Sequence, residues 1–339
     1  MTERAPKPCD SSVVLRVRDL RTHFFTNEGV VKAVDGVDFE IRRGEILGIV
    51  GESGSGKSVT GLSLMRLVAS PPGRIVSGQI EFGGRDLVEA STTEMQDIRG
   101  RRMSMIFQDP LTSLNPVLRI GYQVGEVFRY HLGLSRSKAL HRAVDMLRAT
   151  EIPSPDRRAQ SYPYELSGGM RQRAMIAMAL ACEPELLIAD EPTTALDVTV
   201  QAQVLELMKT ICRERQTALL LITHDMGVVA HMCDRVAVMY AGKIVEYTDV
   251  HTLFARPAHP YTAGLLRSLP RLGAKLRRLA SLEGQPPRLT RLPAGCAFAP
   301  RCPRAQDRCR EVAPDLTRLG NGHQFRCHFP LENDKEPQA

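Results

Sequence analysis

The segment 51–58 constrains the fold of this chain more than any other. It lies between an apolar run at 45–50, which predicts a buried strand, and a helix-compatible run at 59–68. A strand, a G-x-x-x-x-G-K-S loop and a helix in this order predict a phosphate-binding loop. The predicted phosphate-binding residues are Gly51, Glu52, Ser53, Gly54, Ser55, Gly56, Lys57, Ser58 and Val59. The chain is therefore expected to bind a nucleoside triphosphate.

Each residue type in this loop has a physical reason to be there. Glycines lack Cβ atoms, so backbone N–H groups can turn inward around the β- and γ-phosphates, and the helix N-terminus adds positive charge. Lys57 would supply a mobile cation, and the Ser58 hydroxyl would take one Mg²⁺ position. A glycine-rich turn that binds nothing is the alternative, but it does not explain the lysine and serine together.

Composition excludes several other classes of protein. The 339 residues suffice for one large domain and a smaller one. No apolar run approaches 18 residues, and the first 12 residues lack the apolar core of a secretory signal, so we expect a cytoplasmic protein. The net charge is +7, but the arginines are scattered and aromatic residues make up only 5%. These features favour a solvated basic surface, and no nucleic-acid partner is expected.

The order of predicted elements indicates an α/β fold. Strand signals between residues 13 and 41 predict an antiparallel β-region ahead of the loop. Later apolar strands at 103–107, 186–191 and 218–222 alternate with helical patterns, including 120–150 and 200–211. This alternation predicts a mainly parallel sheet covered on both faces. Beyond residue 257 the chain becomes rich in proline and arginine, so we place a domain boundary there.

Polar residues follow the predicted parallel strands at the edge where ligands collect. Asp190 ends an apolar strand and is a candidate Mg²⁺ ligand, and Glu191 is placed to polarise a water against the γ-phosphorus. Two adjacent carboxylates repel each other, and a bound Mg²⁺ would offset that repulsion. His224, just past a later strand, can bond the γ-phosphate and the water. Each residue alone has a structural explanation, but their order and spacing together favour hydrolysis.

With these motifs the chain resembles the ATP-binding subunits of ABC transporters over residues 13–255. The resemblance implies a P-loop NTPase core that is RecA-like, an antiparallel β-subdomain and a helical subdomain at about 109–177. It implies Glu191 and His224 as catalytic residues, and Asp190, Ser58 and Gln108 at Mg²⁺. It also implies nucleotide contacts from Ser167, Gly168, Gly169, Asp197 and an adenine-stacking Phe24 or Phe25. The signature segment that the resemblance implies, Leu166 to Met170, ends in methionine, where most of the superfamily has glutamine. At the stacking position, tyrosine is commoner in the superfamily.

Further segments resemble the oligopeptide/dipeptide importer branch, namely 107–116, 193–204, 259–266 and 282–287. This implies an ATP-binding domain over 1–257 and a C-terminal extension over 258–339. The implied partners are a second, related ATPase (a heterodimer), two transmembrane permease subunits and an extracellular or periplasmic solute-binding protein. The chain would be peripheral on the cytoplasmic face of the membrane. Relatives carry nickel or glutathione as well as peptides, and a soluble ABC ATPase acting on nucleic acid or ribosomes is the remaining alternative.

Four cysteines crowd into the last 44 residues: Cys296, Cys302, Cys309 and Cys327. In a reducing compartment such a cluster favours metal binding over disulfides. Four thiolates suit a 4Fe–4S cluster, which the resemblance also implies, while zinc remains an alternative with His323 or His328 as substitute ligands. Reduced, packed cysteines are a third possibility, but the tail has few other means of making a core. We expect this segment to take no part in hydrolysis, because it is far from the loop in sequence.

Overall fold

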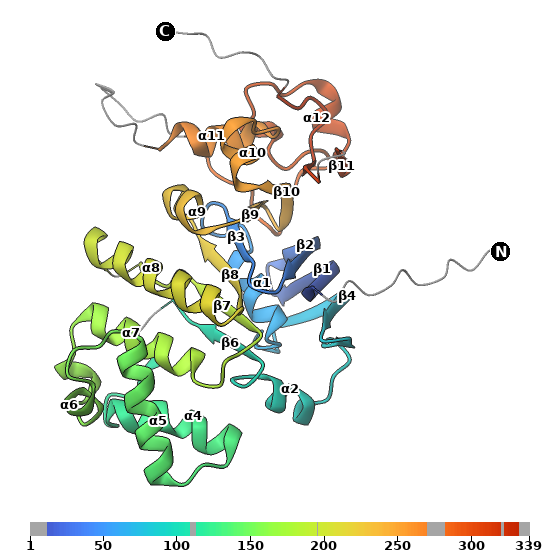
Figure 1. Ribbon diagram of the computed structural model, residues 1–339. Helices are drawn as coiled ribbons and strands as arrows, with labels where there is room; N and C mark the ends of the chain where they lie inside the picture. The colour runs from blue at the N-terminus through green and yellow to red at the C-terminus, as the bar shows by residue number, and fades with distance from the viewer. Residues whose placement is uncertain (1–11, 109–112, 195, 270–281, 320–321, 332–339) are drawn as a thin grey trace.

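The computed structural model describes residues 12–108, 113–194, 196–269, 282–319 and 322–331. Positions 109–112 and 195, which belong to the segments 107–116 and 193–204 named above, lie outside the described residues. The chain forms two sheets with helices around them (Figure 1). The larger sheet carries the phosphate-binding loop, and the smaller one lies beside it.

The larger sheet has the strand order β11-β12-β10-β9-β3-β8-β7-β6. From β9 (Arg235–Tyr240) through β3 (Ile46–Val50), β8 (Ala218–Thr223) and β7 (Leu186–Asp190) to β6 (Met103–Ile106), neighbours pair in parallel. Every residue of β3, β7 and β8 is buried, as expected for parallel strands covered on both faces. The predicted mainly parallel sheet is therefore confirmed.

The smaller sheet is antiparallel, with the order β2-β1-β4-β5. It consists of β1 (Val13–Thr26), β2 (Gly29–Arg42), β4 (Gly73–Phe82) and β5 (Arg85–Asp86). The predicted β-region is confirmed, but its short strand signals belong to two long strands. Register shifts interrupt the pairing of β1 with β2, and they break the alternation that marks a continuous strand in the sequence.

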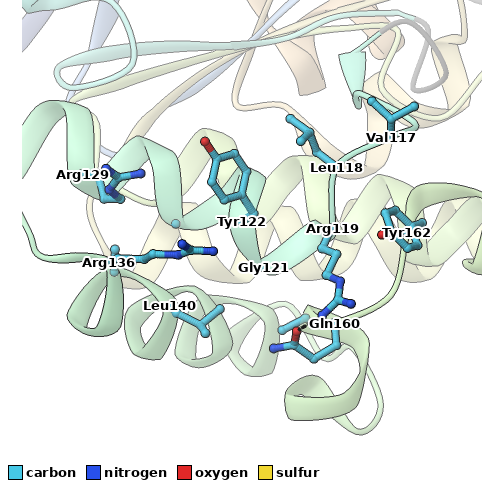
Figure 2. A pocket seen from close by; sticks show the side chains of 13 residues that line it. Val117, Leu118, Arg119, Gly121, Tyr122, Arg129, Arg136, Leu140, Gln160 and Tyr162 are labelled. Atoms are coloured by element: carbon cyan, nitrogen blue, oxygen red, sulfur yellow. Dashed lines mark hydrogen bonds between the residues drawn. The ribbon is translucent and has the colours of Figure 1, made fainter.

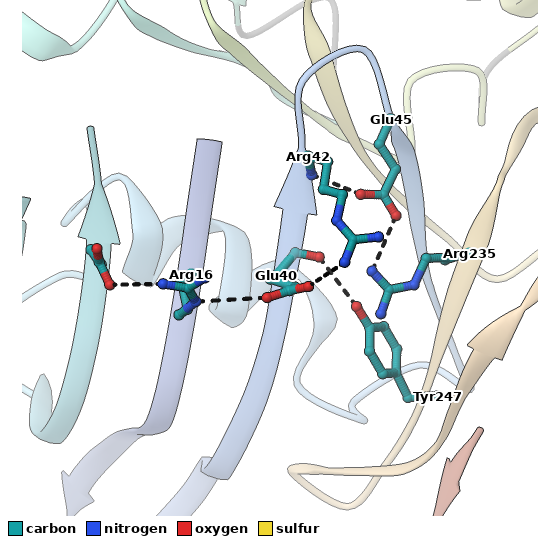
Figure 3. Close-up of polar contacts among 7 residues, drawn as sticks. Arg16, Glu40, Arg42, Glu45, Arg235 and Tyr247 are labelled. Atoms are coloured by element: carbon teal, nitrogen blue, oxygen red, sulfur yellow. Dashed lines mark hydrogen bonds and ion pairs between the residues drawn. The ribbon is translucent and has the colours of Figure 1, made fainter. Parts of the chain in front are cut away.

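A chain of polar contacts joins the two sheets (Figure 3). Arg16 of β1 bridges Glu40 and Glu81 on the neighbouring strands β2 and β4. The Tyr247 hydroxyl of β10 (Lys243–Asp249) then donates to the backbone oxygen of Glu40 at 3.2 Å. The guanidinium of Arg235 lies 4.4 Å from the centre of the Tyr247 ring. These contacts fix the small sheet against the strands that carry the loop.

Four helices form a separate group, at the lower left of Figure 1. They are α4 (Ile120–Leu132), α5 (Arg136–Ala149), α6 (Pro155–Ala159) and α7 (Gly168–Leu180). The continuous helical pattern predicted for 120–150 is two helices. Gly133, with φ 65°, ends α4, and the Ser135 side chain caps α5.

The remaining helices surround the larger sheet or precede it. They are α1 (Lys57–Leu64), α2 (Thr92–Ile98), α8 (Val198–Glu214), α9 (Met226–Met232), α10 (Val250–Ala255), α11 (Pro260–Arg267) and α12 (Asp307–Glu311). Helix α1 ends four residues earlier than predicted. Helix α2 was not predicted, although Ser91 and Glu94 form a capping box at its start.

The C-terminal segment packs onto the rest of the chain. Strand β12 (Gln324–Phe325) pairs with β10, and β11 (Thr317–Arg318) pairs with β12, so the tail extends the larger sheet. Phe298 is 1% exposed and its ring lies 5.4 Å from those of Tyr240 and Tyr261. The expectation that the tail lacks other means of making a core was wrong, because it shares the main core.

Candidate active site

The phosphate-binding loop runs from the end of β3 to the start of α1. Gly56 has φ 107°, and a Cβ there would lie 2.1 Å from the Ala33 oxygen, so only glycine fits. The Lys57 ammonium donates to the backbone oxygens of Gly51 at 2.8 Å and Glu52 at 3.0 Å. Burial lowers the pKa of Lys57, although Glu191 and Asp190 partly oppose that shift. The lysine is thus held inside the loop, next to two carboxylates.

Ser58 and Asp190 meet at the edge of the sheet, as predicted. The Ser58 hydroxyl donates to Asp190 Oδ1 at 3.0 Å, across 132 residues of sequence. Burial raises the pKa of Asp190, and the hydrogen bond from Ser58 opposes the shift. A buried carboxylate whose negative charge is costly is a good ligand for a divalent cation, because the cation would remove that cost. The donor set fits Mg²⁺.

Glu191 is the centre of a polar cluster. Its carboxylate accepts hydrogen bonds from Gln108 Nε2 at 3.2 Å and from Thr194 Oγ1 at 3.0 Å. The His224 ring nitrogen Nδ1 lies 3.0 Å from the other oxygen. Burial raises the pKa of Glu191, but the bonds from His224 and Thr194 outweigh burial and lower it. The carboxylate is therefore ionised at neutral pH and able to accept a proton from water.

The structure brings together residues that were predicted from separate motifs. Gln108, Glu191 and His224 come from the ends of β6, β7 and β8, three strands that are neighbours in the sheet. The backbone of Glu191 is left-handed, with φ 47°, and its N–H donates to the Ile222 oxygen of β8. Sequence reasoning missed Thr194, because no motif reading singles out the third residue after the glutamate.

The predicted signature residues and Asp197 lie at two helix N-termini away from this cluster. Ser167 caps α7 and accepts from the Met170 N–H at 3.3 Å, and Asp197 caps α8. Ser167 and Gly168 are exposed, whereas Gly169 is half-buried beside Val200. Figure 1 shows α7 among the four grouped helices, on another side of the sheet from α1. Exposed N–H groups at the start of α7 are available to an anion outside this chain.

The two candidate adenine-stacking rings differ in their surroundings. Phe24 is partly buried and lies close to Gly73. Phe25 is 42% exposed, and the Arg74 guanidinium lies 4.4 Å from its ring centre. Arg74 therefore lies over one face of the Phe25 ring. That one of these two rings stacks on adenine stays a prediction.

The four C-terminal cysteines line one small cavity, together with His259 and His328. All seven described cysteines are free thiols. Burial raises the pKa of Cys296 and Cys302, and burial together with the other three thiols raises the pKa of Cys327 to about 11. Among the described residues, no three His, Cys, Asp or Glu side chains lie close enough to hold a metal ion. The thiols are gathered but are not in ligand geometry.

Two grooves lie in and beside the helical group. The first, shown in Figure 2, lies between α4, α5 and the segment around Gln160, and its lining includes Arg119, Arg129 and Arg136. The second has a volume of about 570 Å³ and lies between the end of β6 and the helices α4 and α7. Its lining is mainly apolar and includes Leu67 and Val127. The described helices include none that is long and apolar enough to cross a membrane.

Comparison with known proteins gives two family matches. The ABC transporter family matches residues 34–194, and the family described as oligopeptide/dipeptide transporter, C-terminal region, matches residues 245–309. The oligopeptide transport ATP-binding protein AppD of Bacillus subtilis is 50% identical over 96% of this chain and 99% of its own length. The dipeptide transport ATP-binding protein DppD of Escherichia coli is 48% identical over the same shares. A probable peptide ABC transporter ATP-binding protein of Sinorhizobium fredii is 53% identical over 94% of this chain and 95% of its own.

Solved structures resemble the larger part of the fold. The ATP-binding cassette MJ0796, as a dimer in a post-hydrolysis state bound to ADP and phosphate, superposes with a TM-score of 0.63 at 26% identity. The match covers 70% of this chain and 98% of that one. A cassette of the cbiONQ transporter complex from Clostridium perfringens matches with a TM-score of 0.60, covering 72% and 92%. Both matches cover nearly all of the solved chain and leave part of this one unmatched.

Proposed function

The chain belongs to the ABC transporter ATP-binding proteins, and from this membership we propose that it hydrolyses ATP to drive an importer of dipeptides or oligopeptides. The observation that carries the proposal is that about half of the residues are identical, over nearly the whole length, to those of relatives named for peptide transport. The match of residues 245–309 to the C-terminal region of such transporters supports the same branch. We propose an ATP-binding domain over 1–257, with its helical part at about 109–177, and an extension over 258–339.

The polar cluster supports a division of labour in hydrolysis. Lys57 and the loop amides would hold the β- and γ-phosphates, and Ser58 and Asp190 would hold Mg²⁺, which neutralises charge that develops on the phosphate oxygens. Glu191 would take the proton of the attacking water, and His224 and Gln108 would orient it, since both contact the Glu191 carboxylate. We propose that Phe24 or Phe25 contacts the adenine.

A second ATPase chain would complete the site. The exposed N-terminus of α7, with Ser167, Gly168 and Gly169, is an anion site that this chain does not aim at its own loop. Asp197 lies at the N-terminus of α8 and would face the same interface. We propose a head-to-tail pair in which each nucleotide lies between one loop and the partner's α7, with a related but different chain as the partner. Closure would exclude water, and hydrolysis would reopen the pair.

Two permease subunits would dock on the helical group, and the chain would be peripheral at the cytoplasmic face of the membrane. The apolar groove beside β6 fits a short helix of the permease, because it adjoins Gln108 and combines apolar residues of the sheet and of α4. Leu67, which is 39% exposed, and the half-buried Val127 both line the groove. Leu67→Asp and Val127→Asp should uncouple peptide uptake from ATP hydrolysis and leave nucleotide binding intact.

The polar groove of Figure 2 supplies the matched control for docking. Arg136→Asp changes the charge of that groove by two units, against one unit in each of the two docking variants, but should leave uptake unaffected. Loss of uptake in Arg136→Asp, together with normal uptake in the two groove variants, would assign docking to the other groove and refute this part of the proposal.

Transport itself is the decisive measurement. The chain, its partner ATPase, the permeases and the solute-binding protein would be reconstituted in vesicles, and ATP-dependent uptake of a labelled dipeptide and a labelled pentapeptide would be measured. Nickel and glutathione, the solutes of the alternative reading, are tested in the same vesicles. Uptake of nickel or glutathione without peptide uptake would show that this solute, and not a peptide, is the substrate. Co-purification with RNA or ribosomes in place of permeases would refute the transport function.

We also propose that Cys296, Cys302, Cys309 and Cys327 hold a metal centre, a 4Fe–4S cluster with zinc as the alternative. The four thiols already line one cavity, and the raised pKa values of three of them reflect burial that a bound cation would compensate. The side chains would have to move for ligation, because they are not in ligand geometry. Anaerobic purification followed by iron, sulfide and zinc analysis decides between the two, and Cys302→Ser should lower the metal content. Metal-free, folded protein would refute the centre.

A further inference from the structure

An acidic residue lies inside the loop that is predicted to bind a polyanion. Glu52 is the second residue of the phosphate-binding loop, and its side chain is 27% exposed. Its carboxylate is held on both oxygens by Arg301, with Nη1–Oε2 at 2.6 Å and Nη2–Oε1 at 2.9 Å. The Arg301 side chain is 4% exposed. A bidentate pair of this kind, with a buried guanidinium and a half-buried carboxylate, offsets the carboxylate's charge and fixes its position.

Arg301 is itself held in place by the C-terminal half of the chain. Its Nε donates to the Glu283 oxygen at 3.0 Å, and Nη1 also donates to the Tyr240 hydroxyl at 3.3 Å. The guanidinium lies 5.9 Å from the Tyr240 ring centre and 6.0 Å from that of Phe298. Residues from the C-terminal half of the chain therefore hold the loop at Glu52.

A second contact fixes the backbone at the same residue. The Glu52 N–H donates to the Tyr261 hydroxyl at 2.9 Å, and Tyr261 is fully buried. Burial raises the pKa of Tyr261, so its hydroxyl stays neutral and remains an acceptor at physiological pH. The side chain of Glu52 is thus held by Arg301 and its backbone by Tyr261, and both residues lie beyond the predicted boundary of the ATP-binding domain.

We propose that Arg301 is a positioning residue of the nucleotide site, which cancels the charge of Glu52 and so permits tight binding of the triphosphate. The inference rests on the nucleotide site proposed above. Without Arg301, an unpaired carboxylate at the start of the loop repels the phosphates, since charges near a protein surface interact over several ångströms. Arg301 directly precedes Cys302, so the cysteine segment reaches the loop through it. The segment is remote from the loop in sequence but contacts it in the fold, and the expectation that it takes no part in hydrolysis stays a prediction.

The test is a charge-rescue experiment on the full chain. Binding of ATP and ADP is measured by fluorescence titration for wild type, Arg301→Ala, Glu52→Gln and the double variant. Arg301→Ala should weaken ATP binding about tenfold, with a smaller loss for ADP and a larger one at low salt. Glu52→Gln, which removes the negative charge, should restore most of the affinity lost in Arg301→Ala. A purely structural role would not be rescued in this way.

Two further variants keep the proposal testable if Arg301→Ala unfolds. Arg301→Lys keeps a positive charge with a single ammonium and should lose less affinity than the alanine variant. Arg310→Ala, which breaks an exposed pair with Asp307 in the same segment, is the matched control and should bind ATP normally. Affinity within about twofold of wild type in folded Arg301→Ala, or an equal loss in the double variant, would overturn the proposal. Where Arg301→Ala unfolds, a loss of about tenfold or more in folded Arg301→Lys, which keeps the charge, would overturn it.

The outcome is separable from that of the proposed function. Arg301 acts on nucleotide affinity, which is measured on the chain alone, whereas the importer assignment is decided by solute uptake in vesicles. A failed rescue with normal peptide uptake refutes only the role of Arg301. A successful rescue without peptide uptake leaves that role standing and refutes only the substrate.

Discussion

Replacing Glu191 with glutamine isolates the proton-accepting role from the shape of the site. The carboxylate receives three polar contacts, from Gln108, Thr194 and His224, at 3.0 to 3.2 Å. Glutamine has the same size, but its NH₂ group donates hydrogen bonds where the replaced carboxylate oxygen accepted them. The contact to His224 survives if the ring presents an unprotonated nitrogen. We therefore expect a folded protein whose nucleotide loop is undisturbed.

The expected loss of activity follows from the chemistry of the base. Removing a positioned general base costs about 10²- to 10⁴-fold in rate, which corresponds to about 3–5 kcal/mol in the barrier. Because the pKa of Glu191 is lowered from 4.5, the wild-type base is ionised from neutral pH down to below that value. As far as Glu191 sets the pH dependence, the wild-type rate should stay constant as the pH falls from 7 towards 4.5. Glutamine does not ionise, so the small residual rate of Glu191→Gln should show no titration at this position.

The assay requires that the partner ATPase contribute nothing. ATP hydrolysis is measured in the assembled transporter, with the corresponding carboxylate of the partner chain replaced in every sample, and ATP affinity is measured in parallel. Glu214→Gln, which removes an exposed carboxylate at the end of α8, is the control. A hydrolysis rate near wild type in Glu191→Gln, with normal ATP affinity, would show that another group accepts the proton.

Two other substitutions test separate parts of the structure. Lys57→Ala removes the cation that contacts the loop oxygens, and ATP affinity should fall about tenfold or more, as measured by fluorescence titration; unchanged affinity would refute the assignment. Phe298→Ala removes a buried ring from the contact with Tyr240 and Tyr261, and the free energy of unfolding in urea should fall by about 3–5 kcal/mol. A loss below about 1 kcal/mol would contradict tight packing of the C-terminal segment.

The part of the site that faces the nucleotide was predictable because its determinants are local. Gly56 must be glycine for a backbone reason, and Lys57 and Ser58 follow it directly, so spacing alone identifies them. Asp190 and Glu191 end an apolar strand, and parallel strands bring such ends to one edge. The same rule brings His224, which follows a later strand, to this edge, and the structure places its ring nitrogen 3.0 Å from the Glu191 carboxylate.

The other face of the loop was not predictable, because its partners are remote. Arg301 is 249 residues from Glu52, and no periodicity or motif connects them. The tail also has few apolar residues in sequence, yet it joins the main core through Phe298 and extends the sheet through Phe325. Helix α2 was missed for a different reason, since its seven residues are too short to show a helical period.

The remote contacts imply that the ATP-binding domain is not independent at the boundary drawn from the sequence. A chain that ends at residue 257 would lack Tyr261, Phe298 and Arg301, and Glu52 would lose both of its fixed partners. Tyr240 would also be exposed to water on the side where the two rings now pack. Such a truncation should be less stable and should bind ATP more weakly than the full chain, with the binding loss partly reversed by Glu52→Gln. Thermal unfolding and nucleotide titration measure both effects. Equal stability and equal affinity in the truncated chain would mean that the loop is set by its local sequence alone.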